Sequence, residues 1–194
     1  MMGKIYVSPV GRVNDEMMNM IARHIGEMFG FEVDLYTSFP EPDYALDGRR
    51  GQYSSALILQ NLSTICPSDA LRFLAITEAD LFIPMVTFVY GQAQLSGRSA
   101  IVSLARLSQE FYGLQANQEL KIRRARKETA HELGHTFGLV HCRERSCLMS
   151  LSTEILQIDV KSEDFCAGCW AVLEETLTRL RKEIRKNKVV ELRR

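Results

Sequence analysis

The segment HELGHTFGLVHC, residues 131–142, holds three of the four histidines in the chain. His131 and His135 are four positions apart, so on a helix both imidazoles lie on one face and can bind one metal ion. Gly138 allows the chain to turn, because a residue without Cβ tolerates positive φ, and the turn would bring His141 to the same ion. Three protein ligands leave one coordination position open, which is typical of a catalytic zinc rather than a structural one.

Glu132 lies beside the first histidine in the sequence but turns away from the metal-binding face. It would be a poor ligand, yet it could reach a water molecule held by the ion. The metal would polarise a substrate carbonyl and lower the pKa of that water to about 7. Glu132 would accept the proton of the water and pass it to the leaving amine, as a general base and then a general acid. The alternative, solvated histidines on a helix, does not account for a third histidine and a glycine at fixed spacing.

Four of the five cysteines form a second candidate metal site. One pair is separated by four residues and begins directly after His141, and the other pair is separated by two (Cys142 and Cys147; Cys166 and Cys169). Four thiolates can close a tetrahedral zinc with no open position, which would be structural. Such a zinc would tie the active-site loop to the last helix. The alternative is a set of free thiols, and Cys66 is expected to be a buried thiol outside the site.

These ligands require a helix, a turn and a terminal segment to bring them together. A long helix capped by Asn117 is expected to run to Gly138, with apolar residues at steps of three and four. Its basic residues are expected to form the solvated face (Lys121, Arg123, Arg124, Arg126, Lys127). A loop follows, and residues 169–186 are expected to form an amphipathic helix with its apolar side inward (Trp170, Leu173, Leu177, Leu180, Ile184).

Upstream, the pattern predicts a mixed sheet. Strands at 4–10 and 31–36 flank a helix that begins after Asn14 or Asp15 and ends at Gly30, which gives a β-α-β opening. Residues 37–53 are rich in Pro, Gly and Asp and are expected to form an excursion on the surface. A helix at 54–66, a strand at 72–77 and a hairpin of strands at 87–95 and 98–107 complete the prediction. His24 is expected to be an ordinary surface or core histidine.

These motifs resemble those of the metzincin zinc peptidases and, among them, the archaemetzincins. The metzincin signature H-E-x-x-H-x-x-G-x-x-H, followed by a methionine turn, is matched by His131, Glu132, His135, Gly138, His141 and Met149. The cysteine directly after the third histidine, with the three other cysteines of the two pairs, matches the structural zinc site of archaemetzincins. The segments 49–59 and 97–107 also look like that family, so the resemblance spans most of the chain.

The resemblance implies an α/β (α+β), zincin-like fold. A mixed, twisted sheet of about five strands with the active-site helix would form an upper lobe, about 1–138. A small lower lobe, about 139–194, would end in a helix, and the zinc cleft would lie between the two lobes of one domain, 1–194. Met149 would lie beneath the ion, and an edge strand around Thr87 to Gln94 would pair with an extended substrate. Some metzincins carry a tyrosine where this chain has Leu151, so that oxyanion-assisting group is absent.

The composition and charge of the chain limit the classes of function that it can have. The chain has 194 residues, 25% of them charged, and a formal net charge of +0, so no global charge attracts nucleic acid or a membrane. Residues 179–194 are basic, which indicates a solvated face or a docking patch for an acidic partner. Neither a signal peptide nor a membrane span is recognised, so a cytoplasmic protein with reduced thiols is expected.

The leading hypothesis is a cytoplasmic metallopeptidase with two zinc ions, one catalytic and one structural. Its substrates would be peptides or proteins, with restricted specificity, and aminopeptidase action is one form this could take. The first alternative is a zinc-stabilised module that binds peptide or protein without cleaving it. Nucleic-acid binding is a weaker alternative, because the total charge is neutral and no aromatic and basic recognition strip is present.

Overall fold

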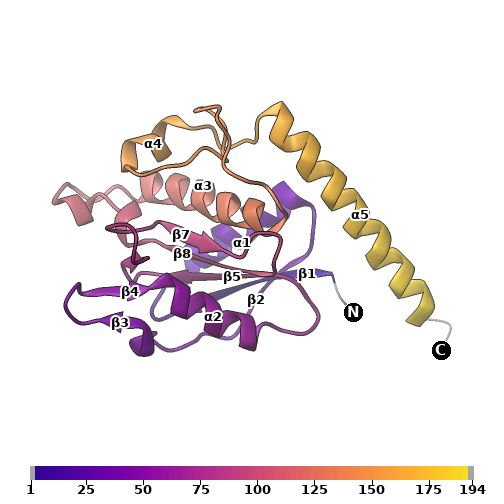
Figure 1. Cartoon of the computed structure of the whole chain (residues 1–194), viewed down its shortest axis with the longest axis horizontal. Helices are drawn as coiled ribbons and strands as arrows, with labels where there is room; N and C mark the ends of the chain where they lie inside the picture. The colour runs from indigo at the N-terminus through magenta and orange to yellow at the C-terminus, as the bar shows by residue number, and fades with distance from the viewer. Residues whose placement is uncertain (1–2, 192–194) are drawn as a thin grey trace.

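A five-stranded mixed sheet forms the centre of the computed structural model, which describes residues 3–191 and, beyond residue 186, only the backbone (Figure 1). Four strands are parallel, and the fifth is antiparallel and lies at the edge. The order is β2 (Val33–Leu35), β1 (Lys4–Val10), β5 (Ala70–Thr77), β8 (Ser99–Ser103) and β7 (Gly91–Ala93). The expected mixed α/β sheet of about five strands is confirmed.

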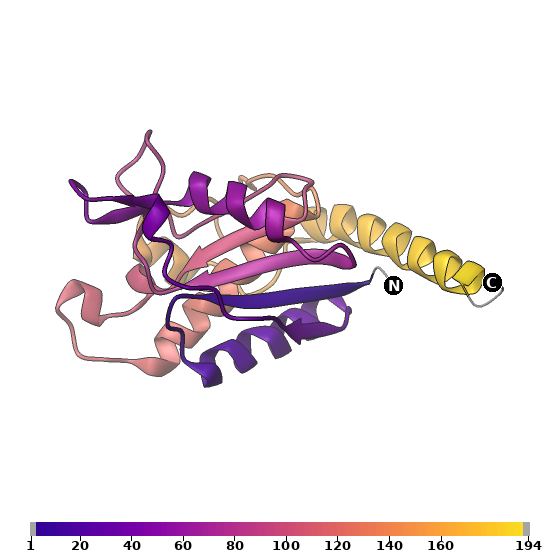
Figure 2. The same cartoon turned by 90° about the horizontal axis from the view of Figure 1, so that it is seen from below.

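Helices cover both faces of this sheet, as Figure 2 shows. The helices α1 (Asp15–Phe29) and α3 (Gln118–Thr136) pack side by side on one face, and α2 (Ser55–Ile65) packs on the other. Every residue of β5 and β8 is therefore buried, as is typical of parallel strands covered on both faces. Two apolar clusters result, one on each side of the sheet.

The helix boundaries follow from the expected capping residues. The side chain of Asn14 accepts a hydrogen bond from the backbone N–H of Met17 at 3.1 Å, and Asn117 accepts one from Leu120 at 3.0 Å. Gly30 ends α1 with φ of 67°, a left-handed conformation that glycine adopts without steric cost. The predicted beginnings of α1 and α3 and the predicted end of α1 are confirmed.

Residues 37–53 are more ordered than the sequence indicates. They contain the short 3-10 helix η1 (Asp43–Ala45) and two strands of a small second sheet, β3 (Leu46–Asp47) and β4 (Gln52–Ser54). The third strand of that sheet is β6 (Leu81–Phe82), which pairs with β4 in parallel. The expected surface excursion is therefore attached to the segment that follows β5. The strand expected at 87–95 is limited to β7, and residues 83–90 form a loop instead.

Two further 3-10 helices, η2 (Ala105–Leu107) and η3 (Glu110–Tyr112), connect β8 to α3. After α3 the chain forms a loop, the short helix α4 (Ile155–Val160) and the long helix α5 (Ala167–Glu191). The helix α4 is not predicted by the sequence pattern. Figure 1 shows α4 on the side of α3 that faces away from the sheet, and α5 extending past the end of the sheet.

Several expectations for individual side chains are wrong. Arg124 and Lys127 are 4% and 8% exposed rather than solvated, because α4 covers them. Trp170 is 41% exposed, because it borders Phe165 at the edge of the core, whereas Leu173 and Leu177 are buried as expected. Cys66 is half-buried rather than buried. The expected basic face at 179–194 lies partly outside the described residues and stays a prediction there.

Within residues 3–191, no helix combines the length and the apolar composition needed to cross a membrane.

Candidate metal centres and active site

A cleft of about 800 Å³ runs along the free edge of β7. One side is formed by β7 and the loop before it, and the floor by α3. The other side is formed by residues after α3, including Val140, Leu151 and Thr153. The cleft contains His131, His135, His141 and Glu132, so the residues singled out in the sequence share one cavity.

The three histidines are oriented for a shared cation. Their candidate ligand nitrogens all lie within 4.8 Å of one another. The Nδ1 atom of His131 donates to the carbonyl of Leu148 at 2.9 Å, and that of His135 donates to the carbonyl of Leu139 at 2.7 Å. Because Nδ1 carries the proton, Nε2 carries the lone pair in each ring.

Those two Nε2 atoms face one another at 3.1 Å. Two lone pairs at that distance repel unless a cation lies between them. A tetrahedral zinc with Zn–N bonds of about 2.0–2.1 Å places two nitrogens about 3.3 Å apart, close to the observed value. Burial also lowers the pKa of all three imidazoles, which favours the neutral, metal-binding form. The donor set therefore fits zinc.

The turn that brings His141 to this site begins at Gly138. Its φ is 99°, a value that other residues rarely adopt, and its N–H donates to the carbonyl of His135 at 3.0 Å. The chain then reverses, and the N–H of Leu139 donates to Gly134 at 3.0 Å. The role expected for Gly138 agrees with this geometry.

Glu132 is 6% exposed and packs against the edge strand. A Cβ atom built on Gly91 of β7 would lie only 2.7 Å from Oε1 of Glu132, so the carboxylate occupies the space that a side chain at position 91 would need. Burial raises the pKa of Glu132 well above its ordinary value, and the neighbouring carboxylate of Glu128 raises it further. Nζ of Lys161 lies 2.7 Å from Oε1 of Glu128, so the two residues form a buried ion pair. The geometry of this contact is not that of a hydrogen bond.

Met149 is fully buried against the helix turn that carries the histidines. A Cβ on Gly134, which lies between His131 and His135 in α3, would be 2.6 Å from the sulfur of Met149. The thioether therefore packs where Gly134 has no side chain. The carbonyl of Met149 accepts a hydrogen bond from the N–H of Cys142 at 2.9 Å, which connects this turn to the cysteine site.

The four cysteines converge as the sequence predicts. Their sulfur atoms lie within 4.8 Å of one another, and those of Cys142 and Cys166 are 3.8 Å apart. A tetrahedral zinc with Zn–S bonds of about 2.3 Å separates its sulfurs by about 3.8 Å. Burial raises the pKa of the Cys147 thiol, and the hydrogen bonds that its sulfur accepts from the backbone N–H groups of Cys166 and Met149, at 3.3 and 3.4 Å, oppose this rise. This donor set also fits zinc.

Residues 45–175 match peptidase family M54.

The chain belongs to peptidase family M54.

Relatives in this family support the assignment across nearly the whole chain. The archaemetzincin of Methanocaldococcus jannaschii is 40% identical over 175 residues, which are 90% of this chain and 95% of the relative. The crystal structure of the archaemetzincin of Methanopyrus kandleri matches with a TM-score of 0.80 at 36% identity and covers 91% of this chain and 96% of that one. A zinc-dependent peptidase from Methanocorpusculum labreanum matches with a TM-score of 0.80 at 29% identity, over 87% of this chain and 99% of that one.

Membership of family M54 makes this chain a zinc metallopeptidase, a hydrolase that acts on peptides or proteins. The resemblance to archaemetzincins and the zincin-like fold are confirmed.

The sequence did not predict the roles of three features of this M54 site: Gly91, Gly134 and the pair of Glu128 with Lys161. Glu128 has a local signal, since it lies one helical turn before Glu132. The other contacts join residues that are distant in sequence, and no spacing pattern marks them.

Proposed function

We propose that this chain hydrolyses peptide bonds in the cleft along β7, with Glu132 as general base and general acid. His131, His135 and His141 would hold the catalytic zinc, and Cys142, Cys147, Cys166 and Cys169 a second, structural zinc. The observation that carries this proposal is the convergence of one ring nitrogen from each of three imidazoles beside the buried carboxylate of Glu132 in one cleft. Met149 and Gly138 would support the site from below and at its turn.

The bound zinc supplies Lewis acidity toward an oxygen of the substrate or of water. The residues of the chain transfer the protons and exclude bulk water. Glu132 is held between α3 and β7, where it can take a proton from the attacking water and give it to the leaving amine. The cavity walls are largely apolar, which excludes bulk water and strengthens these polar interactions.

The backbone of β7 supports binding of an extended peptide. Tyr90 accepts from the N–H of Ser103 and Gln94 donates to Ser99, so residues 90, 92 and 94 direct their backbone groups toward β8. Gly91 and Ala93 therefore direct their N–H and C=O groups to the free edge. A substrate strand can pair with these four groups irrespective of its sequence.

Aminopeptidase action stays a prediction. It would require an anionic group for the substrate ammonium, and the acidic residues in the cleft lining are Glu128, already paired with Lys161, and Glu132. Matched peptides with a free or an acetylated N-terminus distinguish the two modes, because an aminopeptidase cleaves only the free form.

Replacement of Glu132 by Gln tests the proposal. The variant is expected to keep two zinc ions per chain and the wild-type fold, and to lose hydrolysis of a peptide library. Metal analysis and circular dichroism serve as controls. Undiminished cleavage by the variant would exclude Glu132 as the general base, and a wild-type protein that binds peptides but cleaves none would favour the binding-module alternative.

A further inference from the structure

The loop of residues 83–90 forms one wall of the cleft, and this segment is called the cleft wall below. It lines the cavity with the residues Ile83, Val86, Thr87, Phe88, Val89 and Tyr90. Near its end its backbone is bound to strands, since Val89 N–H donates to Leu81 O at 2.9 Å and Tyr90 O accepts from Ser103 N–H at 2.8 Å. Few internal hydrogen bonds hold the part before Val89, such as that from Val86 N–H to the carbonyl of Ile83 at 3.2 Å. The shape of the cleft wall therefore depends on groups outside it.

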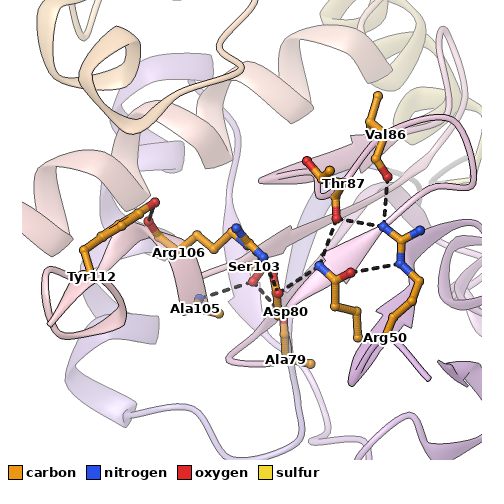
Figure 3. Close-up of polar contacts among 10 residues, drawn as sticks. Arg50, Ala79, Asp80, Val86, Thr87, Ser103, Ala105, Arg106 and Tyr112 are labelled. Atoms are coloured by element: carbon orange, nitrogen blue, oxygen red, sulfur yellow. Dashed lines mark hydrogen bonds and ion pairs between the residues drawn. The ribbon is translucent and has the colours of Figure 1, made fainter. Parts of the chain in front are cut away.

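Arg50 binds the middle of the cleft wall through its side chain, as Figure 3 shows. Its Nη2 donates to the carbonyls of Val86 and Thr87 at 3.0 and 2.9 Å. Its Nε donates to the side-chain oxygen of Gln52 at 3.0 Å, and its guanidinium lies 4.3 Å from the ring centre of Phe82. A planar guanidinium fixed by a neighbouring side chain and a ring loses less freedom when it binds the two carbonyls.

Gln52 connects this contact to the interior. It is 7% exposed, and its amide nitrogen donates to Thr87 O at 3.1 Å and to Asp80 at 2.9 Å. Arg106 holds Asp80 from the other side with two hydrogen bonds of 2.6 and 2.8 Å. Figure 3 shows Arg106 on the side of Asp80 opposite to Arg50. Arg106 also lies 4.1 Å from the ring centre of Phe88, so the network contacts the cleft wall at residues 86–88 from two directions.

We propose that Arg50 is a positioning residue for substrate binding, acting with Gln52 to hold the cleft wall in the shape that receives one end of an extended peptide. The inference rests on the proposed function, because it assumes a peptide lying along β7. Since the cleft wall precedes β7, it flanks one side of the scissile bond. Arg50 is not among the residues that line the cleft.

Loss of the Arg50 side chain is expected to change the affinity for extended ligands more than the rate of the chemical step. When Arg50 is absent, two carbonyls lose a charged donor and the cleft wall samples other shapes. An extended ligand must then order it again, which lowers affinity. A ligand that contacts only the metal is unaffected. Because Arg50 is exposed to water, the expected loss of affinity is modest, about tenfold for one set of charge-assisted hydrogen bonds.

The test uses the zinc-loaded full chain and three hydroxamates: acetohydroxamate, one with a dipeptide on the N-terminal side and one with a dipeptide on the C-terminal side of the metal-binding group. Arg50→Ala is expected to raise the dissociation constant of only one of the two extended ligands, by about tenfold. Arg50→Lys, which keeps the charge but not the fork, is expected to lie between Arg50→Ala and the wild type.

Arg49→Ala is the matched control, because Arg49 donates to Asp47 through its backbone N–H, which the substitution keeps. It is expected to leave all three dissociation constants unchanged. Hydrogen exchange provides a second readout: amides of the cleft wall are expected to exchange faster in Arg50→Ala than in Arg49→Ala, while those of α3 do not.

Equal weakening of all three ligands, or none, in Arg50→Ala overturns the positioning role. So does a wild-type protein that binds acetohydroxamate but neither extended ligand. If the extended hydroxamates bind while no peptide is cleaved, the proposed hydrolysis is wrong. The role of Arg50 in binding is then still tested by comparing the dissociation constants of Arg50→Ala with those of the wild type.

Discussion

Gly91 has no side chain, and Glu132 occupies the space that a side chain at position 91 would need. A Cβ at position 91 would lie 2.6 Å from Cγ of Glu132 and 2.8 Å from the carbonyl oxygen of Ile101. Glu132 can move, but the carbonyl belongs to β8 and cannot move without disturbing the sheet. Any larger residue at position 91 therefore displaces the carboxylate or the edge strand.

We expect Gly91→Ala to lower the rate of peptide hydrolysis by about a hundredfold, because a shift of about 1 Å in a catalytic group has that effect. The histidine nitrogens are not contacted, so the zinc content is expected to stay at the wild-type level. Gly168→Ala is the control, since a Cβ there meets no atom within 4 Å. Wild-type activity in Gly91→Ala would show that Glu132 does not depend on this contact.

Residue spacing was sufficient to predict that the three imidazoles and the four thiols converge, because imidazoles four apart on a helix and paired cysteines carry their geometry in the local sequence. It was not sufficient for Gly91. The role of that glycine depends on an antiparallel edge strand lying over α3, and neither element alone indicates the contact.

At the scale of elements, α3 shows why the expected solvated face was wrong. The guanidinium of Arg124 forms two hydrogen bonds of 2.7 Å with the carboxylate of Asp159, and Lys127 donates to the carbonyls of Ile158 and Asp159 at 2.9 and 3.0 Å. These partners are the last turn of α4, whose negative end attracts cations. The six residues of α4 are too few to show a periodic pattern, so their effect on α3 was not predictable.

Removal of the Arg124 side chain leaves Asp159 without its charged partner. We expect Arg124→Ala to lower the free energy of unfolding by about 3 kcal/mol, as is typical when one member of a largely buried ion pair is removed. Arg123→Ala, at the exposed neighbouring position, is expected to change it by less than about 0.5 kcal/mol. Urea denaturation of the zinc-loaded proteins measures both values, and equal losses would contradict a structural role for the pair.

The four cysteines bring the loop after α3 and the beginning of α5 together. Cys142 and Cys147 lie on the loop after α3, and Cys169 lies in the first turn of α5. We expect Cys169→Ser to reduce the bound zinc from two ions to one and to lower the melting temperature by several degrees, because structural zinc contributes directly to folding. Cys66→Ser, outside the site, is expected to keep both ions. Two ions retained in Cys169→Ser would exclude this cysteine as a ligand.

At the scale of the whole molecule, the apolar cluster on the α1 and α3 side of the sheet continues into residues 139–177. It joins Ile5 and Val102 of the sheet to Leu148, Met149 and Leu173. We propose that the upper lobe, 1–138, and the lower lobe, 139–194, form one domain that unfolds in a single transition when both zinc ions are bound. The sequence motifs suggested the two lobes, but a core shared between them follows only from how the chain packs.

The remaining histidine, His24, is expected to make the stability of this molecule depend on pH. It is 7% exposed, and among the described side chains its Nε2 has no hydrogen-bond partner. Burial, and then the charge of Arg126, lower its pKa from 6.5 to about 4. Because the unfolded chain binds this proton below about pH 6.5 and the folded chain only near pH 4, acid favours unfolding within that window, and stability is regained as the pH rises.

We expect the free energy of unfolding to fall by about 2–3 kcal/mol between pH 7 and pH 4.5 through His24 alone, at 1.36 kcal/mol per pKa unit. Acid also protonates the zinc-binding histidines, so the measurement compares the wild type with His24→Gln at saturating zinc. Metal loss contributes to both curves, and their difference isolates His24. Since Gln does not titrate, its curve is expected to be flatter, and parallel curves from pH 7 to pH 4.5 would show that the buried imidazole does not resist protonation.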